Sequence, residues 1–594
     1  MYTKTIAGII IVLSVALGLF STWNESPVVD EVPHIGAGYS YVTQGSYIFN
    51  PEHPPLAKDL AGIALALLDL DQSAFSMPHP GYWPTDIHGE WNFGRNLIFN
   101  SGNDAMLVTR VARIPLFLFF ILSALIIFIW TRKLYGDKAS LIALFLFCMS
   151  PTILAHGRLV TTDVAALFGV LLSSYFFVKF IQNQTKINLV LAGLAFGVAQ
   201  LTKFSLVLII PLFFLIAVIW GASHKNWRLA VKSLLLTAVI MIIGVVTIIW
   251  PTYALHVQND NPQTQRADAI DILKDFGYDS QKNPTLMRKA ADLTIWASDK
   301  PIIRSLSHYT LGVLMVVQRN AGGNTTYFFG HINFVGSMSY FPLVYFIKEP
   351  LPFWGLTLIG LIGLLYGFKK FKFDRISSWS KNHIGEITML LWLAIYWYTS
   401  LTAHLNIGVR HLIPTFGFVY ILLSGQIAQI LEILKYKKKA LAVFATMIFL
   451  LLGWYLVENL NVFPYYLTYF NQTVGGPTGG HRYVVDSNLD WGQDLKRLGD
   501  WAEKNNIDKI NLDYFGWSDP RYYLGDKYAY TSGGMYKSAE EFLKAYPAGG
   551  YLAISATFYM QSKYDQDKFY AWLDAYKPVI TIGNSILVWH IPPR

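Results

Sequence analysis

Long apolar runs alternate with polar segments along this chain. A helix needs about 20 mostly apolar residues to cross a membrane, and eleven runs reach or approach that length. The pattern predicts membrane helices over residues 5–23, 108–130, 137–153, 162–181, 187–202, 204–220, 231–254, 351–368, 386–402, 409–432 and 440–459. The first run resembles a signal peptide, but no small-x-small cleavage site clearly follows it. We therefore expect it to remain as the first helix.

Basic residues are distributed unevenly among the connections between these helices. With the N-terminus inside, the inside connections hold clusters of lysine and arginine within residues 132–138, 225–228, 369–381 and 435–439. The short outside turns then carry only Arg158, Lys203 and Arg410. Because cytoplasmic connections are enriched in lysine and arginine, we predict a multi-pass protein of the plasma membrane with a cytoplasmic N-terminus.

Three large polar segments then lie outside, over residues 24–107, 255–350 and 460–594. They are rich in aromatic residues, glycine and proline, which is typical of ordered structure and not of linkers. The last one combines a helix-like run (residues 494–505) with strand-like runs (residues 509–515, 550–556 and 580–591). We predict a membrane domain over residues 1–459 and an extracytoplasmic α/β domain over residues 460–594.

Composition supports a polytopic α-helical membrane protein. The 594 residues are 53% hydrophobic and only 14% charged, whereas soluble proteins are about 25% charged. The net charge of +9 does not indicate a nucleic-acid partner, because the basic residues form short clusters between apolar runs. The single cysteine, Cys148, excludes a disulfide framework and a thiolate zinc site, and we expect it to be buried as a small hydrophobic side chain.

Polar residues collect where the predicted helices reach the outer side. Asp30 and Glu31 directly follow the first helix, and His34 comes soon after. Adjacent acids at this place fit a general base or a metal site, although a solvated loop start explains them equally simply. Lys58 follows two prolines that favour a helix start. It is placed either to meet a lipid phosphate or to extend its amine to the membrane surface.

Four cations lie at these outer ends, namely Lys58, Arg158, Lys203 and Arg410. If they meet in space, they would form a phosphate or pyrophosphate site. Asp163 begins the fourth predicted helix, where it either holds a cation or complements the helix dipole. No nucleotide-binding glycine loop, zinc-protease motif or serine-hydrolase motif occurs in the chain, which disfavours an ATP-driven pump and a serine hydrolase.

Two motifs of the first polar segment resemble those of the protein O-mannosyltransferases. They are Asp30-Glu31-Val32-Pro33-His34 and Glu52-His53-Pro54-Pro55-Leu56-Ala57-Lys58. The aminoarabinose–lipid A transferases look similar here, and both groups are GT-C glycosyltransferases of the family 39 type. The resemblance extends to residues 156–163, 201–203 and 408–414 and to the stretch Asp486-Ser487-Asn488-Leu489-Asp490-Trp491-Gly492-Gln493-Asp494. An extra Pro33 and the α/β tail depart from the O-mannosyltransferase pattern, which leaves the acceptor open.

The resemblance implies inverting transfer of a sugar from a polyprenyl-phosphate donor to a hydroxyl of a glycan, lipid or protein on the outer face. It implies Asp30 as the catalytic base with Glu31 beside it. The implied donor-phosphate residues are Lys58, Arg158, Lys203 and Arg410, and the implied substrate-binding residues are His34, His53, Asp163 and His411. A divalent metal ion could be held by Glu52, His53 and His331, since the aminoarabinose transferases place an acid at the matching position. No other cofactor is expected.

Two alternatives remain at this point. A transporter or lipid flippase would place its polar residues near the middle of the membrane, often in inverted repeats, whereas here they lie at outer ends and no repeat is visible. A non-catalytic scaffold would need neither the acid pair nor the cations. The sequence therefore favours a glycosyltransferase.

Overall fold

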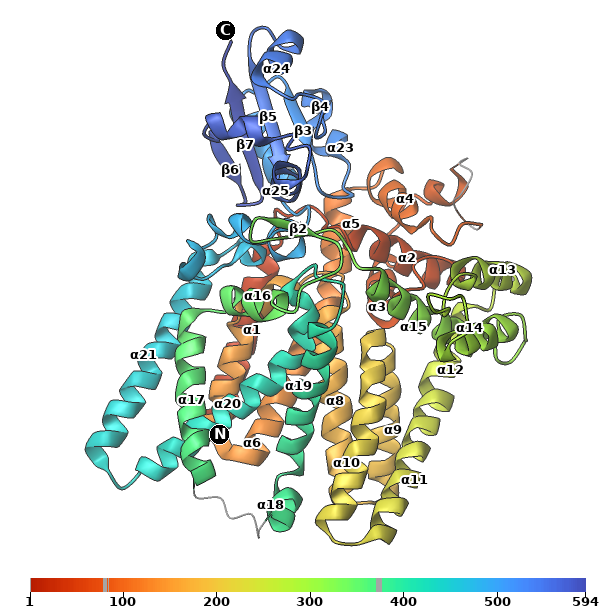
Figure 1. Cartoon of the computed structure of the whole chain (residues 1–594), viewed down its shortest axis with the longest axis vertical. Helices are drawn as coiled ribbons and strands as arrows, with labels where there is room; N and C mark the ends of the chain where they lie inside the picture. Colours follow the sequence, from red (N-terminus) through yellow and green to blue (C-terminus); the bar gives the residue numbers. More distant parts are fainter. Residues whose placement is uncertain (1, 78–82, 84, 370–375, 594) are drawn as a thin grey trace.

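The computed structural model describes residues 2–77, 83, 85–369 and 376–593. Long helices form a bundle, and the polar segments and a β-sheet cover one end of it (Figure 1). Eight described helical stretches are long and apolar enough to cross a membrane, namely Tyr2–Ser21, Ala105–Cys148, Asp163–Gln182, Phe204–Ser223, Trp227–His256, Ile384–Leu401, Val409–Leu434 and Lys438–Val462. A ninth is added if Tyr340–Lys348 and Leu351–Leu365, which meet at 111°, form one span. The chain is thus a multi-pass membrane protein, but eleven spans are not confirmed.

Two local features explain the difference in count. Helix α6 (Phe117–Cys148) is interrupted by Gly136, whose φ of +85° suits glycine, so two predicted runs fall within the single stretch Ala105–Cys148. Helix α9 (Lys186–Gln200) has only 15 residues. The remaining bundle helices are α1 (Tyr2–Ser21), α5 (Ala105–Arg113), α8 (Asp163–Gln182), α10 (Ile209–Ser223), α11 (Trp227–Gly244), α17 (Leu351–Lys369), α19 (Ile384–Leu401), α20 (Ile413–Leu434) and α21 (Lys438–Val462).

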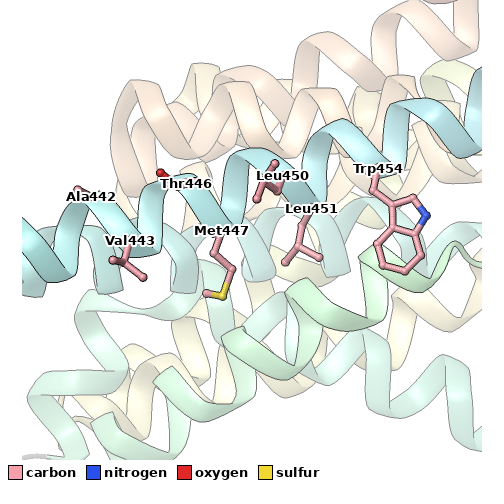
Figure 2. A pocket seen from close by; sticks show the side chains of 7 residues that line it. All are labelled: Ala442, Val443, Thr446, Met447, Leu450, Leu451 and Trp454. Carbon is pink, nitrogen blue, oxygen red and sulfur yellow. The ribbon is translucent and has the colours of Figure 1, made fainter.

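The core of the bundle lies around α6, α8 and α20, which pack against one another. Helix α10 packs beside them, where Phe213 stacks on Phe177 of α8 with ring centroids 3.8 Å apart. Helix α21 is different, because its apolar side chains face outward. Figure 2 shows the shallow apolar groove along it, lined by Ala442, Val443, Thr446, Met447, Leu450, Leu451 and Trp454. A face of this kind at membrane depth is suited to contact with lipid chains.

The first two polar segments fold into short helices over the end of the bundle. The first holds α2 (Glu31–Gln44), α3 (Leu56–Leu65) and α4 (Glu90–Arg95). Helix α12 (Trp250–His256) ends the membrane-crossing stretch Trp227–His256. The second segment then holds α13 (Pro262–Leu273), α14 (Leu286–Ala297), α15 (Arg304–Gly322), the hairpin β1 (Thr326–Phe328) and β2 (His331–Asn333), and α16 (Tyr340–Lys348). Helices α2 and α3 approach closely at Gly38 and Gly62, where a Cβ on either would lie 2.1 Å from a backbone oxygen. This contact fixes the segment that carries Asp30.

The C-terminal region contains a five-stranded sheet in the order β4-β3-β5-β7-β6. Strands β3 (Ile510–Asp513), β4 (Tyr528–Tyr530) and β5 (Gly550–Ser555) are parallel, and β7 (Ile586–Ile591) pairs antiparallel with β5 and with β6 (Ile580–Ile582). Helices α22 (Leu495–Lys504) and α25 (Ala556–Tyr564) accompany the sheet. The predicted α/β character of this region is confirmed, while the boundary at residue 459 stays a prediction.

The basic connections lie at the other end of the bundle. The turns between α10 and α11 and between α20 and α21 are far from the sheet (Figure 1). Lys370, Lys372 and Arg375 of the predicted basic cluster lie outside the described residues. The arrangement separates the basic connections from the three polar segments.

Candidate functional site

A cavity of about 330 Å³ opens where the polar segments meet the bundle. Its polar wall includes Asp30, His34, Glu52, His53, Lys203, Arg319, Arg410 and His411, and its apolar wall includes Val207, Leu208, Val313, Val316 and Val317. These side chains come from the start of α2, the turn before α3, the 3-10 turn before α10, helix α15 and the 3-10 turn before α20. The fold therefore gathers seven of the predicted site residues around one space, and Arg319 joins them.

The charges of this wall alternate between cations and carboxylates. Asp30 precedes α2, and its Oδ2 accepts a hydrogen bond of 2.7 Å from Nη1 of Arg410. The same Nη1 lies 3.7 Å from Oδ2 of Asp163. Nζ of Lys203 donates to Oδ1 of Asp163 at 2.6 Å. Asp163 is only 1% exposed, so it stands behind the two cations and orients them toward the cavity.

The C-terminal region supplies the surface on which Arg410 rests. The guanidinium carbon lies 4.2 Å from the centroid of the Trp491 ring, within the range of a cation–π contact. Nε of Arg410 donates to Oγ of Ser487 at 3.1 Å. The backbone N–H of Val29 donates to the carbonyl oxygen of Trp491 at 2.8 Å. Residues 487–491 thus hold both Arg410 and the segment that carries Asp30.

The opposite part of the polar wall contains a second ion pair. Nη1 of Arg319 donates to both carboxylate oxygens of Glu52, at 2.9 and 3.0 Å. The rings of His34 and His53 lie 4.9 Å apart between centroids. Burial lowers the pKa of both imidazoles, which favours their neutral forms at pH 7. Arg319 lies in the last turn of the amphipathic helix α15, where a basic residue is common, and no sequence motif singles it out.

The three residues predicted to hold a metal ion do not all come together, because His331 lies apart from Glu52 and His53. Glu52 is engaged by Arg319, and His331 is exposed on β2 away from the cavity wall. Among the described residues, no group of three or more histidine, cysteine, aspartate or glutamate side chains is arranged to hold a metal ion. The residues present therefore do not fit a metal ion, and no step below depends on one.

Lys58 points into the protein and does not contribute to the cavity wall that the described residues form. It is fully buried, and its Nζ donates at 2.8 Å to Oη of Tyr41, to the carbonyl oxygen of Asn50 and to that of His53. These contacts fix the turn that presents Glu52 and His53. A role of Lys58 at the donor phosphate stays a prediction, and its contacts favour a structural role.

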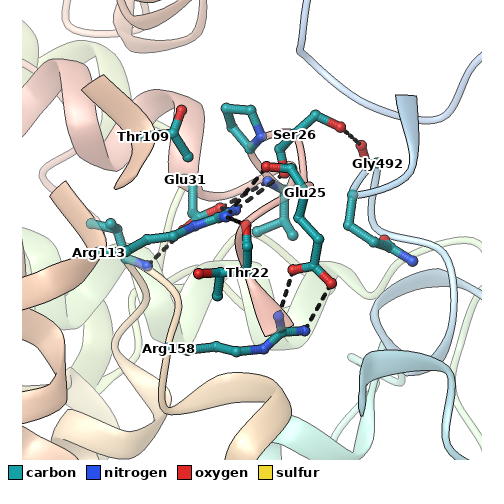
Figure 3. Close-up of polar contacts among 12 residues, drawn as sticks. Thr22, Glu25, Ser26, Glu31, Thr109, Arg113, Arg158 and Gly492 are labelled. Carbon is teal, nitrogen blue, oxygen red and sulfur yellow. Dashed lines mark hydrogen bonds and ion pairs between the residues drawn. The ribbon is translucent and has the colours of Figure 1, made fainter. Parts of the chain in front are cut away.

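Glu31 and Arg158 belong to a buried charge cluster that is separate from the cavity wall (Figure 3). Arg158 donates to both oxygens of Glu25, at 2.7 and 3.1 Å, and Arg113 donates to both oxygens of Glu31, at 2.8 and 2.5 Å. Burial alone would raise the pKa of Glu25, but Arg158, Arg497 and Arg113 together hold it below the usual range. The cluster joins the end of α1, the start of α2 and the C-terminal region. The site roles predicted for Glu31 and Arg158 remain untested predictions.

Replacement of Glu25 by glutamine is expected to destabilise the protein by about 3–5 kcal/mol, because the buried charge of Arg158 would lose its partner. The measurement is thermal unfolding of the purified protein in detergent. The double variant Glu25→Leu with Arg158→Leu should regain most of the lost stability, because the charge that Glu25 neutralises is then removed as well, while Arg113 keeps Glu31 and Arg497 keeps Asp494 as partners. An unchanged unfolding temperature in Glu25→Gln would show that the ion pair does not stabilise the fold.

Comparison with known proteins identifies the fold. The family model described as dolichyl-phosphate-mannose-protein mannosyltransferase matches residues 105–250, which include Asp163 and Lys203. The structure of the S. cerevisiae protein O-mannosyltransferase Pmt1-Pmt2 complex bound to the sugar donor superposes with a TM-score of 0.54 at 12% identity. It covers 85% of this chain and 92% of that one. The chain has the GT-C glycosyltransferase fold. The predicted GT-C fold class is therefore confirmed.

Two further structures cover more of the chain at lower similarity. ArnT from Cupriavidus metallidurans bound to undecaprenyl phosphate has a TM-score of 0.45 and 11% identity, covering 98% of this chain and 97% of its own. The oligosaccharyltransferase AglB from Archaeoglobus fulgidus, in complex with an inhibitory peptide and a dolichol-phosphate, has a TM-score of 0.46 and 12% identity. The match covers 97% of this chain and 72% of the AglB chain. No curated protein sequence matches the chain. The family match supports a GT-C glycosyltransferase over a transporter.

Proposed function

We propose that this protein transfers a sugar from a polyprenyl-phosphate donor to an acceptor hydroxyl, with inversion at the anomeric carbon. The observation that carries the proposal is the pair formed by Asp30 and Arg410, 2.7 Å apart on the wall of one cavity. A carboxylate and a guanidinium side by side provide a base for the acceptor and a cation for the leaving phosphate. The match of residues 105–250 to the mannosyltransferase family supports this assignment.

Arg410 and Lys203 are the proposed donor-phosphate residues. As the bond between C1 and the phosphate oxygen breaks, its electron pair passes to the phosphate, and cations fixed beside that oxygen stabilise the developing charge. Nε2 of His411 is buried and has no hydrogen-bond partner among the described residues, so it is free to donate to a phosphate oxygen. The apolar wall formed by Val207, Val313 and their neighbours suits the first isoprenoid units of the lipid.

Asp30 is the proposed general base. In an inverting reaction the acceptor oxygen attacks C1 from the side opposite the departing phosphate, and its proton passes to a carboxylate. The hydrogen bond from Arg410 fixes the orientation of that carboxylate.

The products are the acceptor with an inverted glycosidic bond, free polyprenyl phosphate and a proton on Asp30. His34, His53 and Glu52 lie where sugar hydroxyls could reach them.

This reaction takes place on the outer face of the plasma membrane in the orientation that we propose, with the N-terminus cytoplasmic and residues 460–594 extracytoplasmic. It is supported by the basic connections at the end of the bundle that is remote from the cavity (Figure 1). It is also supported by the cavity wall, which includes residues of the first two polar segments, while the third holds Arg410 through Ser487 and Trp491.

The direct test is a transfer assay on the purified protein in lipid nanodiscs. Radiolabelled polyprenyl-phosphate sugars are offered one at a time, with a membrane extract as the source of acceptor. We expect label to move from one donor into a new product with the parent protein and not with the Asp30→Asn variant. Absence of transfer from every donor, with the protein shown to be folded and saturated with donor, would contradict the proposal.

The Lys58→Met variant separates a structural role from a donor-binding role. Three buried oxygen acceptors would lose their donor, so we expect a stability loss of about 1–3 kcal/mol. The affinity of the folded variant for undecaprenyl phosphate should not change, because Lys58 faces away from the cavity. Unfolding temperature and lipid affinity are measured on the same preparation. A large loss of affinity without loss of stability would place Lys58 at the phosphate.

A further inference from the structure

Aromatic side chains form a surface that continues from the cavity onto the C-terminal sheet. Trp91 of α4 belongs to the cavity wall, and its ring lies 5.0 Å from that of Trp517, with the planes inclined by 31°. Trp517 follows β3 in the same loop as Phe515, whose ring meets Phe558 of α25 at 5.4 Å. All four rings are half-buried, so each keeps part of its surface accessible.

The position of this surface in the sheet is typical of a ligand site. Strands β3 and β5 are parallel neighbours, whereas β4 lies on the other side of β3. The chain therefore changes direction across the sheet between β3 and β5, and open α/β sheets bind ligands at the carboxyl ends of strands at such a point. The loop with Trp517 leaves the carboxyl end of β3, and α25 leaves that of β5. The N–H of Phe515 donates to Oγ of Ser555 at 3.0 Å, which joins the two ends.

The chemistry of this surface suits a saccharide. Sugar rings present apolar C–H faces, which cover exposed aromatic rings, and hydroxyl edges, which need polar partners. Arg95 and Asp519 pair at 3.0 Å beside the two tryptophans, with Arg95 partly exposed, and Asp30 lies further inside the cavity. A peptide that binds by strand addition needs a free sheet edge, but β3 and β5 are paired on both sides.

We propose that Trp91 and Trp517 form an acceptor subsite that binds a saccharide, so that the enzyme adds its sugar to a glycan. This inference rests on the proposed function and specifies its acceptor. The glycan stacks on the two indole rings and extends one hydroxyl to Asp30. The acceptor then enters from the side of the C-terminal sheet, while the donor lipid occupies the apolar wall on the side of the bundle.

The test measures saccharide binding to the full chain in nanodiscs without any donor. Saturation-transfer NMR is recorded with oligosaccharides of glucose, mannose, galactose and N-acetylglucosamine, and with a mixture of serine- and threonine-containing peptides. We expect at least one oligosaccharide to bind. Trp517→Ala and Trp91→Ala should each weaken that binding by about three- to tenfold, as the loss of one stacking ring predicts.

Trp501→Ala is the matched control, because Trp501 is a half-buried indole of the same region that packs on Tyr551 away from the cavity. It should leave saccharide binding unchanged. Binding of peptides but of no oligosaccharide, or equal saccharide binding in all three variants and the parent, would overturn the inference. Undecaprenyl phosphate affinity is measured in parallel. A protein that binds this lipid but no saccharide contradicts the acceptor subsite alone, whereas a folded protein that does not bind the lipid contradicts the proposed function.

Discussion

Replacement of Asp30 by asparagine is expected to lower the rate of sugar transfer by about 10²–10⁴-fold, the contribution of a general base. Asparagine has nearly the same shape and can still accept the hydrogen bond from Arg410, but it cannot take the proton of the acceptor hydroxyl. The affinity for undecaprenyl phosphate should therefore remain close to that of the parent protein. The measurements are the single-turnover rate with saturating donor and the lipid affinity of the same preparation.

Asp59→Asn is the control for this variant. Asp59 lies on α3, where its carboxylate is 2.8 Å from Nε2 of His256, and it does not belong to the cavity wall. Its replacement should therefore leave the transfer rate unchanged. Near-normal transfer by Asp30→Asn would remove Asp30 from the role of base. Equal loss of transfer and of lipid affinity would instead show that Asp30 holds the donor site together and does not act on the acceptor.

The main features of the fold could be predicted because membrane helices depend on the length and hydropathy of single runs. The predicted spans that are not confirmed concern features that an apolar run does not reveal. Gly136 breaks α6 through a single positive φ, and α9 is a 15-residue helix inside the bundle. The strands of the tail are visible in the sequence because β5 and β7 are mostly apolar runs and β3 alternates apolar and polar residues, Ile510-Asn511-Leu512-Asp513.

The site could be predicted only in part. Whether a charged residue faces the cavity or is neutralised depends on its partner, and a partner remote in the sequence is not visible in the local pattern. Lys203 and Arg410 were found as cations at outer helix ends, and both belong to the cavity wall. Arg158 carried the same signal, yet it is neutralised by Glu25, which no motif had marked. The partner of Arg319, Glu52, lies 267 residues away in the chain. Pairings at such separation follow from the tertiary fold and not from local pattern.

The Arg410→Lys variant is expected to lower kcat/KM by about 10²–10³-fold, comparable to the loss of one donor that stabilises a transition-state charge. Lysine keeps the positive charge but not the planar group that bonds Asp30 and Ser487 while it lies against Trp491. Transfer kinetics with varied donor concentration provide the measurement. Arg266→Lys is the control, since Arg266 also pairs with an aspartate, Asp299, but outside the cavity; its kinetics should match those of the parent.

The contribution of the C-terminal region is measured by combining Arg410→Lys with Trp491→Leu. If Trp491 acts by holding the guanidinium, its replacement alone should reduce transfer, and its replacement in the Arg410→Lys background should reduce transfer little further. Groups that act through one another give effects that do not add, whereas independent groups give effects that do. Additive losses would show that Trp491 supports another part of the site. Non-additive losses would make residues 487–491 part of the catalytic structure, which explains why the tail inserts beneath Arg410 and does not merely cover the cavity.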